Sequence, residues 1–341
     1  HMKLDMTINM LTMEFDDPVR ASTVAITQFR IQNANNSVAQ SLRLTDSIPT
    51  ASYQYLYIQL SDTDADNLKL NPLLATSVDT FFLSCTFITI TDIAGNVMPP
   101  IATSNARQLD EFVSDTVNPI MQSFDLNMNT ERFTFRFTEA VLVETFAVTD
   151  ILIQSRFLST DGYSYRLTTN SAVISASGKD VVVQIGSEDV FNLKNTPFLI
   201  EIPAATLITF PSTLVNDTSG NPVIPVPDGA AKLVNIFTPD SIRPTVVGAA
   251  FNGDKNRIDI TFNELVRIST LQANGITVAE SATSFNYFTL TLGQSVSNNS
   301  EANGFSLTME VLISTSDMNF LKQRYPLISS PETTYITVGS N

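Results

Sequence analysis

The chain has 341 residues, of which 43% are hydrophobic and 16% charged, and its formal net charge is -15. Nucleic acids and anionic lipids both require clustered Lys and Arg on their protein partners, so this charge argues against both. The only histidine is His1, in a His-Met pair that resembles a cloning remnant, so histidine-dependent catalytic relays and zinc sites are excluded and we predict a protein that is not an enzyme.

A pattern of alternating apolar and polar side chains that ends in a carboxylate and a Val occurs three times, at residues 11–19, 133–141 and 258–266. Val19 and Val141 are 122 residues apart, and Val141 and Val266 are 125 residues apart. A period of this length is typical of a tandem array of domains. No apolar run is long enough to span a membrane, so we expect no direct membrane insertion.

The second repeat shows a full set of short strands separated by clusters of Gly, Asn, Ser and Asp. They are expected at 120–126, 133–141, 151–154, 163–167, 181–185 and 206–210, with a final strand through Val223 and Leu233. This spacing predicts an all-β fold built of three tandem Ig-like β-sandwich domains, the last incomplete. The single cysteine, Cys85, has Phe210 as its repeat counterpart and is expected to be a small buried hydrophobe.

One short helix is predicted in each repeat, at 62–69, 187–194 and 316–322. Each segment contains an aspartate four residues before a Leu; these are Asp64, Asp189 and Asp317. Acidic residues are favoured in the first turn of a helix, so we interpret these side chains as capping groups.

Two junctions of the same form lie 125 residues apart, at 115–119 and 240–244. Each begins with Asp and ends with Pro, which fixes an extended entry into the next strand. The predicted domains are therefore residues 3–114, with a clipped first strand, residues 119–239, and residues 244–341, which lack the final turn and strand. The chain is expected to be a fragment of a longer array.

The second repeat pairs an early Phe-x-Glu-x-Val at 137–141 with a late Asp-x-x-Gly-Asn at 217–221. The first repeat has the late motif at 92–96 but departs from the early one with Asp17 and Pro18, and the third has the early motif at 262–266 but lacks the late one. This pairing resembles the Ig-like repeats of large surface proteins, namely those of bacterial surface-layer type and similar repeats of algal and diatom adhesive proteins. The resemblance implies a secreted or cell-surface, extracellular module with a non-catalytic structural or adhesion role. Its expected partners are other copies of the array and extracellular glycans or surfaces.

An alternative function is a carbohydrate-binding repeat array attached to a larger secreted protein. Tyr53, Tyr55 and Tyr57 could form a stripe of rings for stacking on sugars, or a structural ladder on a sheet surface. A glycosidase with paired carboxylates is a weaker competitor, because the acids recur at strand ends in every repeat and a repeated residue usually serves the scaffold.

The repeated acids are also candidate ligands for Ca²⁺, which prefers carboxylate and carbonyl oxygens. The predicted groups are the first junction, the second junction and the outer end of the first domain: Asp115, Glu139, Asp217 and Asn221; Asp240 and Glu264; and Asp17, Asp92 and Asn96. The metal-free alternative is that the Asp of Asp-x-x-Gly-Asn caps its own turn, with Gly and Asn at positive φ and Glu139 bonded to the same loop. The sequence leaves both open.

Overall fold

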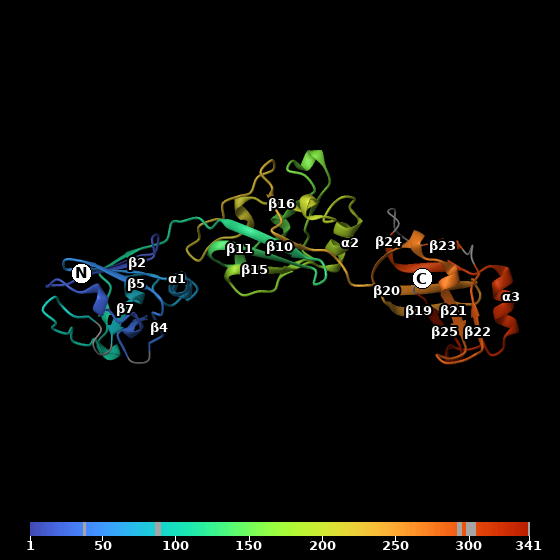
Figure 1. Cartoon of the computed structure of the whole chain (residues 1–341), viewed down its shortest axis with the longest axis horizontal. Coiled ribbons are helices and arrows are strands. Elements are labelled where there is room, and N and C mark those ends of the chain that lie inside the picture. Colours follow the sequence, from blue (N-terminus) through green and yellow to red (C-terminus); the bar gives the residue numbers. More distant parts are fainter. Residues whose placement is uncertain (37–38, 86–89, 292–294, 298–304, 340–341) are drawn as a thin grey trace. The chain divides into compact units, whose positions relative to one another are not determined.

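The computed structural model describes residues 1–36, 39–85, 90–291, 295–297 and 305–339. Its contacts divide the chain into two units, His1–Asp240 and Ser241–Asn341 (Figure 1). Short strands dominate throughout, and the described residues contain three α-helices. The predicted fold class is confirmed to the extent that the protein is all-β and built of sandwiches. The division into three domains stays a prediction.

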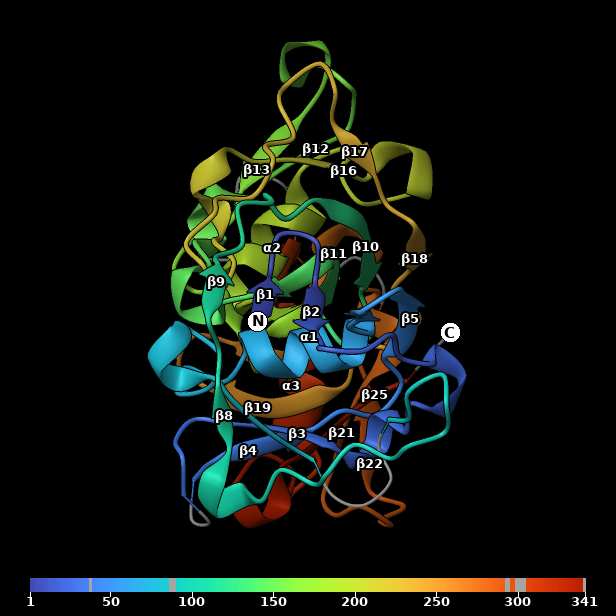
Figure 2. The ribbon, with the colours of Figure 1, turned by 90° about the vertical axis from the view of Figure 1, so that its left-hand side faces the viewer.

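The first unit contains two sandwiches. The strands and helix of the first sandwich are β1 (Met2–Asp5), β2 (Met10–Glu14), β3 (Phe29–Gln32), β4 (Ser41–Arg43), β5 (Ile48–Ser52), β6 (Tyr55–Gln59), α1 (Asp62–Lys69), β7 (Phe82–Cys85), β8 (Arg107–Gln108) and β9 (Glu111–Val113). One sheet has the order β5-β6-β2-β1-β9 and the other β4-β3-β7-β8. Figure 2 shows β1 between β9 and β2, in the order that the hydrogen bonds give.

The second sandwich repeats this arrangement with longer strands. Its elements are β10 (Met121–Asn127), β11 (Arg132–Val141), β12 (Leu152–Gln154), β13 (Ser164–Arg166), β14 (Ala172–Val173), β15 (Gly178–Gln184), α2 (Ser187–Asn195), β16 (Leu207–Thr209), β17 (Lys232–Leu233) and β18 (Ile236–Thr238). The sheets are β14-β15-β11-β10-β18 and β13-β12-β16-β17. Strand for strand, these orders match those of the first sandwich.

The second unit holds the third sandwich. Its elements are β19 (Val246–Asn252), β20 (Arg257–Arg267), β21 (Ile276–Ala279), β22 (Tyr287–Thr289), β23 (Ser295–Ser297), β24 (Phe305–Leu312), α3 (Thr315–Gln323) and β25 (Tyr335–Val338). The sheets β19-β20-β24-β23 and β22-β21-β25 correspond to β10-β11-β15-β14 and β13-β12-β16 of the second sandwich.

Each sandwich has its own hydrophobic core, made by the inward-facing residues of its strands. On β11 the residues Phe133, Phe135 and Phe137 are at most 1% exposed, while the polar residues between them point outward. This alternation is what the sequence predicted from the period of two in a strand. Cys85 is buried in the first core, as expected for a small hydrophobe.

The single strand predicted through Val223 and Leu233 is wrong. The chain there makes only isolated bridges, such as Phe210 to Val226, before the short strands β17 and β18 begin. Pro222, Pro225 and Pro227 interrupt the segment. Proline has no backbone N–H to donate to a ladder, so a continuous strand cannot form there.

The three predicted helices are present, but the capping role assigned to their aspartates is wrong. Ser61 caps α1 by accepting a hydrogen bond from the N–H of Asp64, and Ser314 does the same for Asp317 of α3. Asp64 and Asp189 are 0% exposed and Asp317 is 1% exposed, because the aspartate side chains point into the protein.

These buried aspartates tie the helix to a loop from earlier in the same sandwich, the one that follows β4, β13 or β22. Asp189 accepts hydrogen bonds from the Thr168 N–H at 3.1 Å, the Ser171 hydroxyl at 2.5 Å and the Tyr165 hydroxyl at 2.8 Å. Burial by itself would raise the pKa of Asp189, but the bonds from Ser171, Tyr165 and Thr168 outweigh it and the pKa is lowered. Asp64 accepts from Thr45, and Asp317 from Thr291, in the same way.

We therefore expect Asp189→Ala to destabilise the second sandwich by about 3 kcal/mol, because buried donors would lose a charged acceptor. Urea unfolding measures the loss. Asp161→Ala, an exposed aspartate of the same sandwich, is the matched control and should change stability little. Equal losses in the two variants would contradict a structural role for the buried carboxylate.

Candidate functional site

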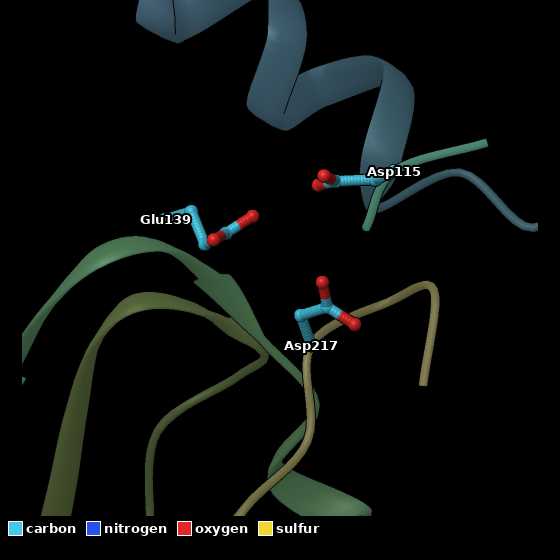
Figure 3. A group of neighbouring side chains, drawn as sticks. All are labelled: Asp115, Glu139 and Asp217. Carbon is cyan, nitrogen blue, oxygen red and sulfur yellow. The ribbon is translucent and has the colours of Figure 1, made fainter. Parts of the chain in front are cut away.

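Three carboxylates meet where the first sandwich joins the second (Figure 3). Asp115 lies in the linker between β9 and β10, Glu139 near the end of β11, and Asp217 in the turn that follows β16. One oxygen from each lies within 4.8 Å of the others. Glu139 shares the inward face of β11 with Phe135 and Phe137, so the strand's alternation points it toward the end of the core.

A lysine from the first sandwich lies against this group. Lys69 is the last residue of α1, and its Nζ donates to Asp115 Oδ2 at 2.6 Å and to Glu139 Oε2 at 2.8 Å. The Lys69 side chain is 6% exposed, that of Asp115 1% and that of Glu139 10%. The contact is therefore a buried ion pair that joins α1 to both the linker and β11.

Asp217 belongs to a self-contained turn. Its Oδ1 accepts from the N–H groups of Ser219 at 2.9 Å and Asn221 at 2.7 Å, and its Oδ2 accepts from the Asn221 side-chain amide at 2.8 Å. Gly220 has φ of 90°, but Asn221 is not at positive φ. The turn thus follows the metal-free interpretation, except that only the glycine adopts the left-handed conformation.

The turn is also connected to the linker. The Asn221 amide donates to the backbone carbonyl of Asp115 at 3.1 Å, and Asp115 Oδ1 accepts from the Val117 N–H at 2.9 Å. Glu139 bonds to Lys69 rather than to the turn, contrary to the metal-free expectation for that residue. The predicted first group, Asp115, Glu139, Asp217 and Asn221, is thus brought together, with Lys69 as an additional member.

The pKa shifts at this site reflect its burial and its excess of acidic over basic side chains. The pKa of Glu139 is raised from 4.5 to about 7; burial raises it most, the Lys69 ammonium opposes the shift, and the Asp115 charge adds to it. Burial would lower the pKa of Lys69, but the hydrogen bonds to Asp115 and Glu139 outweigh it and the pKa is raised. Lys69 is therefore charged at neutral pH, and Glu139 titrates near neutrality.

The ligand types fit Ca²⁺, but the ammonium competes for the same oxygens. Ca²⁺ takes six to eight oxygen ligands. Asp115 Oδ2 and Glu139 Oε2 already accept from Lys69, and both oxygens of Asp217 accept from its own turn. An ion could bind between the carboxylates only if Lys69 moved away. Calcium binding therefore stays a prediction, in which Ca²⁺ and the Lys69 ammonium compete for the same carboxylate oxygens.

A second ionic contact crosses the same junction. Lys179 Nζ, on β15 of the second sandwich, lies 3.2 Å from Asp62 Oδ2 and 3.2 Å from Asp66 Oδ2, both on α1. Asp62 is mostly exposed, and such surface pairs each stabilise a protein by well under about 1 kcal/mol. The contact adds to the orientation of α1 more than to stability.

The other predicted ligands have surroundings of their own. At the outer end of the first sandwich, Asp92 accepts from the Asn96 N–H at 2.7 Å and from its side-chain amide at 2.7 Å, as Asp217 does, while Asp17 is exposed. Asp240 ends the first unit, where Lys194 Nζ lies 2.5 Å from its Oδ2. Glu264 lies on β20 in the second unit.

Sequence reasoning missed Lys69, although a signal for it was present. Leu-Lys ends the predicted helix in all three repeats, with Lys69, Lys194 and Lys322 spaced by 125 and 128 residues. Lys69 and Lys194 both pair with the first residue of an Asp…Pro junction, Asp115 and Asp240. A lysine that recurs in step with a linker aspartate was the pattern to recognise.

Only two of the three tyrosines predicted to form a stripe lie on the same strand. Tyr55 and Tyr57 lie on β6 with ring centroids 6.3 Å apart, and the Tyr55 hydroxyl donates to Glu14. Tyr53 lies in the hairpin turn before β6 at φ of 53° and is 81% exposed. It does not share the strand face of the other two, so the row of three rings on one face is wrong.

Comparisons with known proteins show no family for this chain. No protein-family model matches the chain, and no curated protein matches it. Among solved structures, the chain is similar to a marsupial T cell receptor, with 9% sequence identity, a TM-score of 0.17, and coverage of 90% of this chain and 89% of that one. In the described part of the chain, no helix has the length and apolar character required to cross a bilayer.

Glu139 should make junction stability depend on pH. Its pKa is about 7 in the folded protein against 4.5 for an ordinary carboxyl, so the folded state binds the proton more tightly. This contribution is fully present below pH 4.5 and is lost as the pH rises through about 7. Glu139→Gln should flatten the fall in unfolding free energy across that window, measured by denaturant titration at several pH values.

The matched control is Glu144→Gln, an exposed glutamate of the same sandwich, which should keep the wild-type pH profile. A Glu139→Gln profile that runs parallel to the wild type would show that Glu139 does not titrate in this window.

The competition between Lys69 and Ca²⁺ can be tested by removing the ammonium. We expect millimolar Ca²⁺ to change the melting temperature of the wild type little. Lys69→Gln leaves three neighbouring carboxylates without their cation, and Ca²⁺ should stabilise this variant, by about 2.7 kcal/mol if the ion is present at about 100 times its Kd. Thermal melts with Ca²⁺ and with a chelator measure the difference.

Lys3→Gln is the control, because it removes a lysine 2.7 Å from Glu111 on the surface and creates no buried charge. If Ca²⁺ stabilises the wild type as much as Lys69→Gln, then calcium and not Lys69 is the cation of the junction.

Proposed function

We propose that this chain is a non-catalytic structural and adhesion module of an extracellular surface protein, in which successive sandwiches of a longer array are held in a fixed orientation. The observation that carries this proposal is the buried contact of Lys69 with Asp115 and Glu139. It links the helix of one sandwich to the linker and a strand of the next, which is the contact that a stiff array requires.

Several contacts support a structural role over a ligand-binding one. Asp115 is fixed by Lys69, by the Val117 N–H and, through its carbonyl, by Asn221, so the linker is attached on several sides. The Asn118 side chain donates to the Pro222 carbonyl at 2.6 Å and adds another attachment. A linker held by side chains of both neighbouring sandwiches has little freedom to bend.

The chemistry of the ion pair favours orientation over stability. Burying charges costs several kcal/mol each, and their attraction roughly offsets this, so the net stabilisation of such a pair is small. Breaking the pair by removing one partner is costly, because the other charge stays buried. Relative positions of the sandwiches that separate Lys69 from its carboxylates are therefore disfavoured, and this is the property that supports a spacer.

The extracellular and adhesive parts of the proposal are supported by the resemblance to surface-protein repeats. They are also supported by the composition, in which only 16% of residues are charged and the net charge is -15. The carbohydrate-binding alternative stays a prediction, because Tyr55 already bonds to Glu14 and stacks on Tyr57.

The rigidity of the first unit is testable with spin labels at Ser52 and Thr160, exposed positions on the first and second sandwiches. Electron-electron dipolar spectroscopy should give a narrow distance distribution in the wild type. Lys69→Gln combined with Lys179→Gln should broaden it, since both ionic contacts across the junction are lost. Lys3→Gln, which changes a lysine within the first sandwich, should leave it narrow. A broad wild-type distribution would refute the stiff-spacer function.

A further inference from the structure

The outer end of the first sandwich carries the same surface that α1 covers on the second. Asp17 is the counterpart of Glu139, Asp92 of Asp217, and Asn96 of Asn221. The backbone agrees, because Val19 bridges to Asp92 as Val141 bridges to Asp217. Gly95 has φ of 97° where Gly220 has 90°. The acceptor surface of the junction is therefore built twice in the first unit.

The two copies of this surface differ in what covers them. On the second sandwich, Glu139 is 7% exposed and Asp217 is 0% exposed, because α1, Lys69 and the linker lie over them. On the first sandwich, Asp17 is exposed and Asp92 half-buried. A hollow of about 160 Å³ lies over Asp17 and Asp92, with Phe15 and Met98 also in its lining.

The matching donor is present at the end of α3. Lys322 occupies the helix position of Lys69 and Lys194, directly after a buried Leu. Its side chain is exposed, and it makes no ion pair within the part of the chain that the structure describes. Arg324 lies two residues further on and donates to the Tyr287 carbonyl, so the end of α3 is positively charged.

We propose that a second copy of this chain docks head to tail on the first, with Lys322 at the end of α3 bound between Asp17 and Asp92 of the neighbour. This contact deepens the proposed function, on which it rests, by naming the partner of the uncovered surface. Charge complementarity carries the assignment, together with the internal example of Lys69, which pairs with Glu139, the repeat counterpart of Asp17.

Such a contact has defined consequences for assembly. The two surfaces differ, so the interface is heterologous and repeats into linear chains rather than closing as a two-fold dimer. One helix end covers far less than the roughly 1,000 Å² of a stable interface, so association in solution is weak and falls as salt rises. Within a covalent array the same contact benefits from high effective concentration.

A zero-length carbodiimide cross-linker tests the pairing, because it forms an amide only between a lysine and a carboxylate already in contact. The full chain is cross-linked at high concentration as a mixture of ¹⁴N and ¹⁵N protein, so mass spectrometry separates links between molecules from links within one. We expect mixed-isotope peptides that join Lys322 to Asp17 or Asp92, and a ladder of multimers. Because Lys322→Gln lacks the amine of this link, its effect is read from the mixed-isotope links that the other lysines make, whose yield should fall roughly tenfold, the effect of losing one specific charged contact.

Lys255→Gln is the matched control, since it removes another exposed lysine of the same unit and should leave the ladder unchanged. Absence of mixed-isotope links, or links that persist in Lys322→Gln, would overturn the proposal. Neither result affects the stiffness of the junction at Lys69, which the spin-label distances test separately.

Discussion

The organisation of the first unit depends on one ammonium group buried between two carboxylates. Lys69 extends from the end of α1 to Asp115 in the linker and to Glu139 on β11. The side chains of all three residues are almost fully buried. In that environment a charge without a partner is costly, so the contact restricts the positions that the two sandwiches can adopt. The surrounding acids explain why a cation is needed there, and the lysine supplies it from within the chain.

The helix has the same two roles in each repeat. A buried aspartate on the helix, Asp64, Asp189 or Asp317, binds the helix to an earlier loop of the same sandwich. The fastened helix in turn presents a lysine at its end, as in Lys69 and Lys194, each of which meets a junction aspartate. The buried aspartate therefore also supports the contact between the lysine and the junction aspartate, because a helix that could shift on its own sandwich would not hold its lysine in place.

Much of the fold was open to prediction from the sequence. The alternation of Phe133, Phe135 and Phe137 with polar residues identifies a strand, because side chains in a strand point to opposite faces in turn. The Asp-x-x-Gly-Asn turn was also predictable, since Asp217 bonds to groups within four residues. The prediction failed where prolines break a ladder between Val223 and Leu233, and where Asp189 points inward rather than to its own helix end.

The sequence by itself determined the sandwich architecture, the period of the repeats and the gathering of Asp115, Glu139 and Asp217 at the end of a sandwich. All of these follow from local alternation, turn chemistry and regular spacing. Only the tertiary structure decided that Lys69, which lies 46 residues before Asp115, is the cation among these acids. The reason is physical: the recurring Leu-Lys marks a lysine at the end of each helix, but which cation enters a buried acidic group depends on how a helix of one sandwich packs on the next.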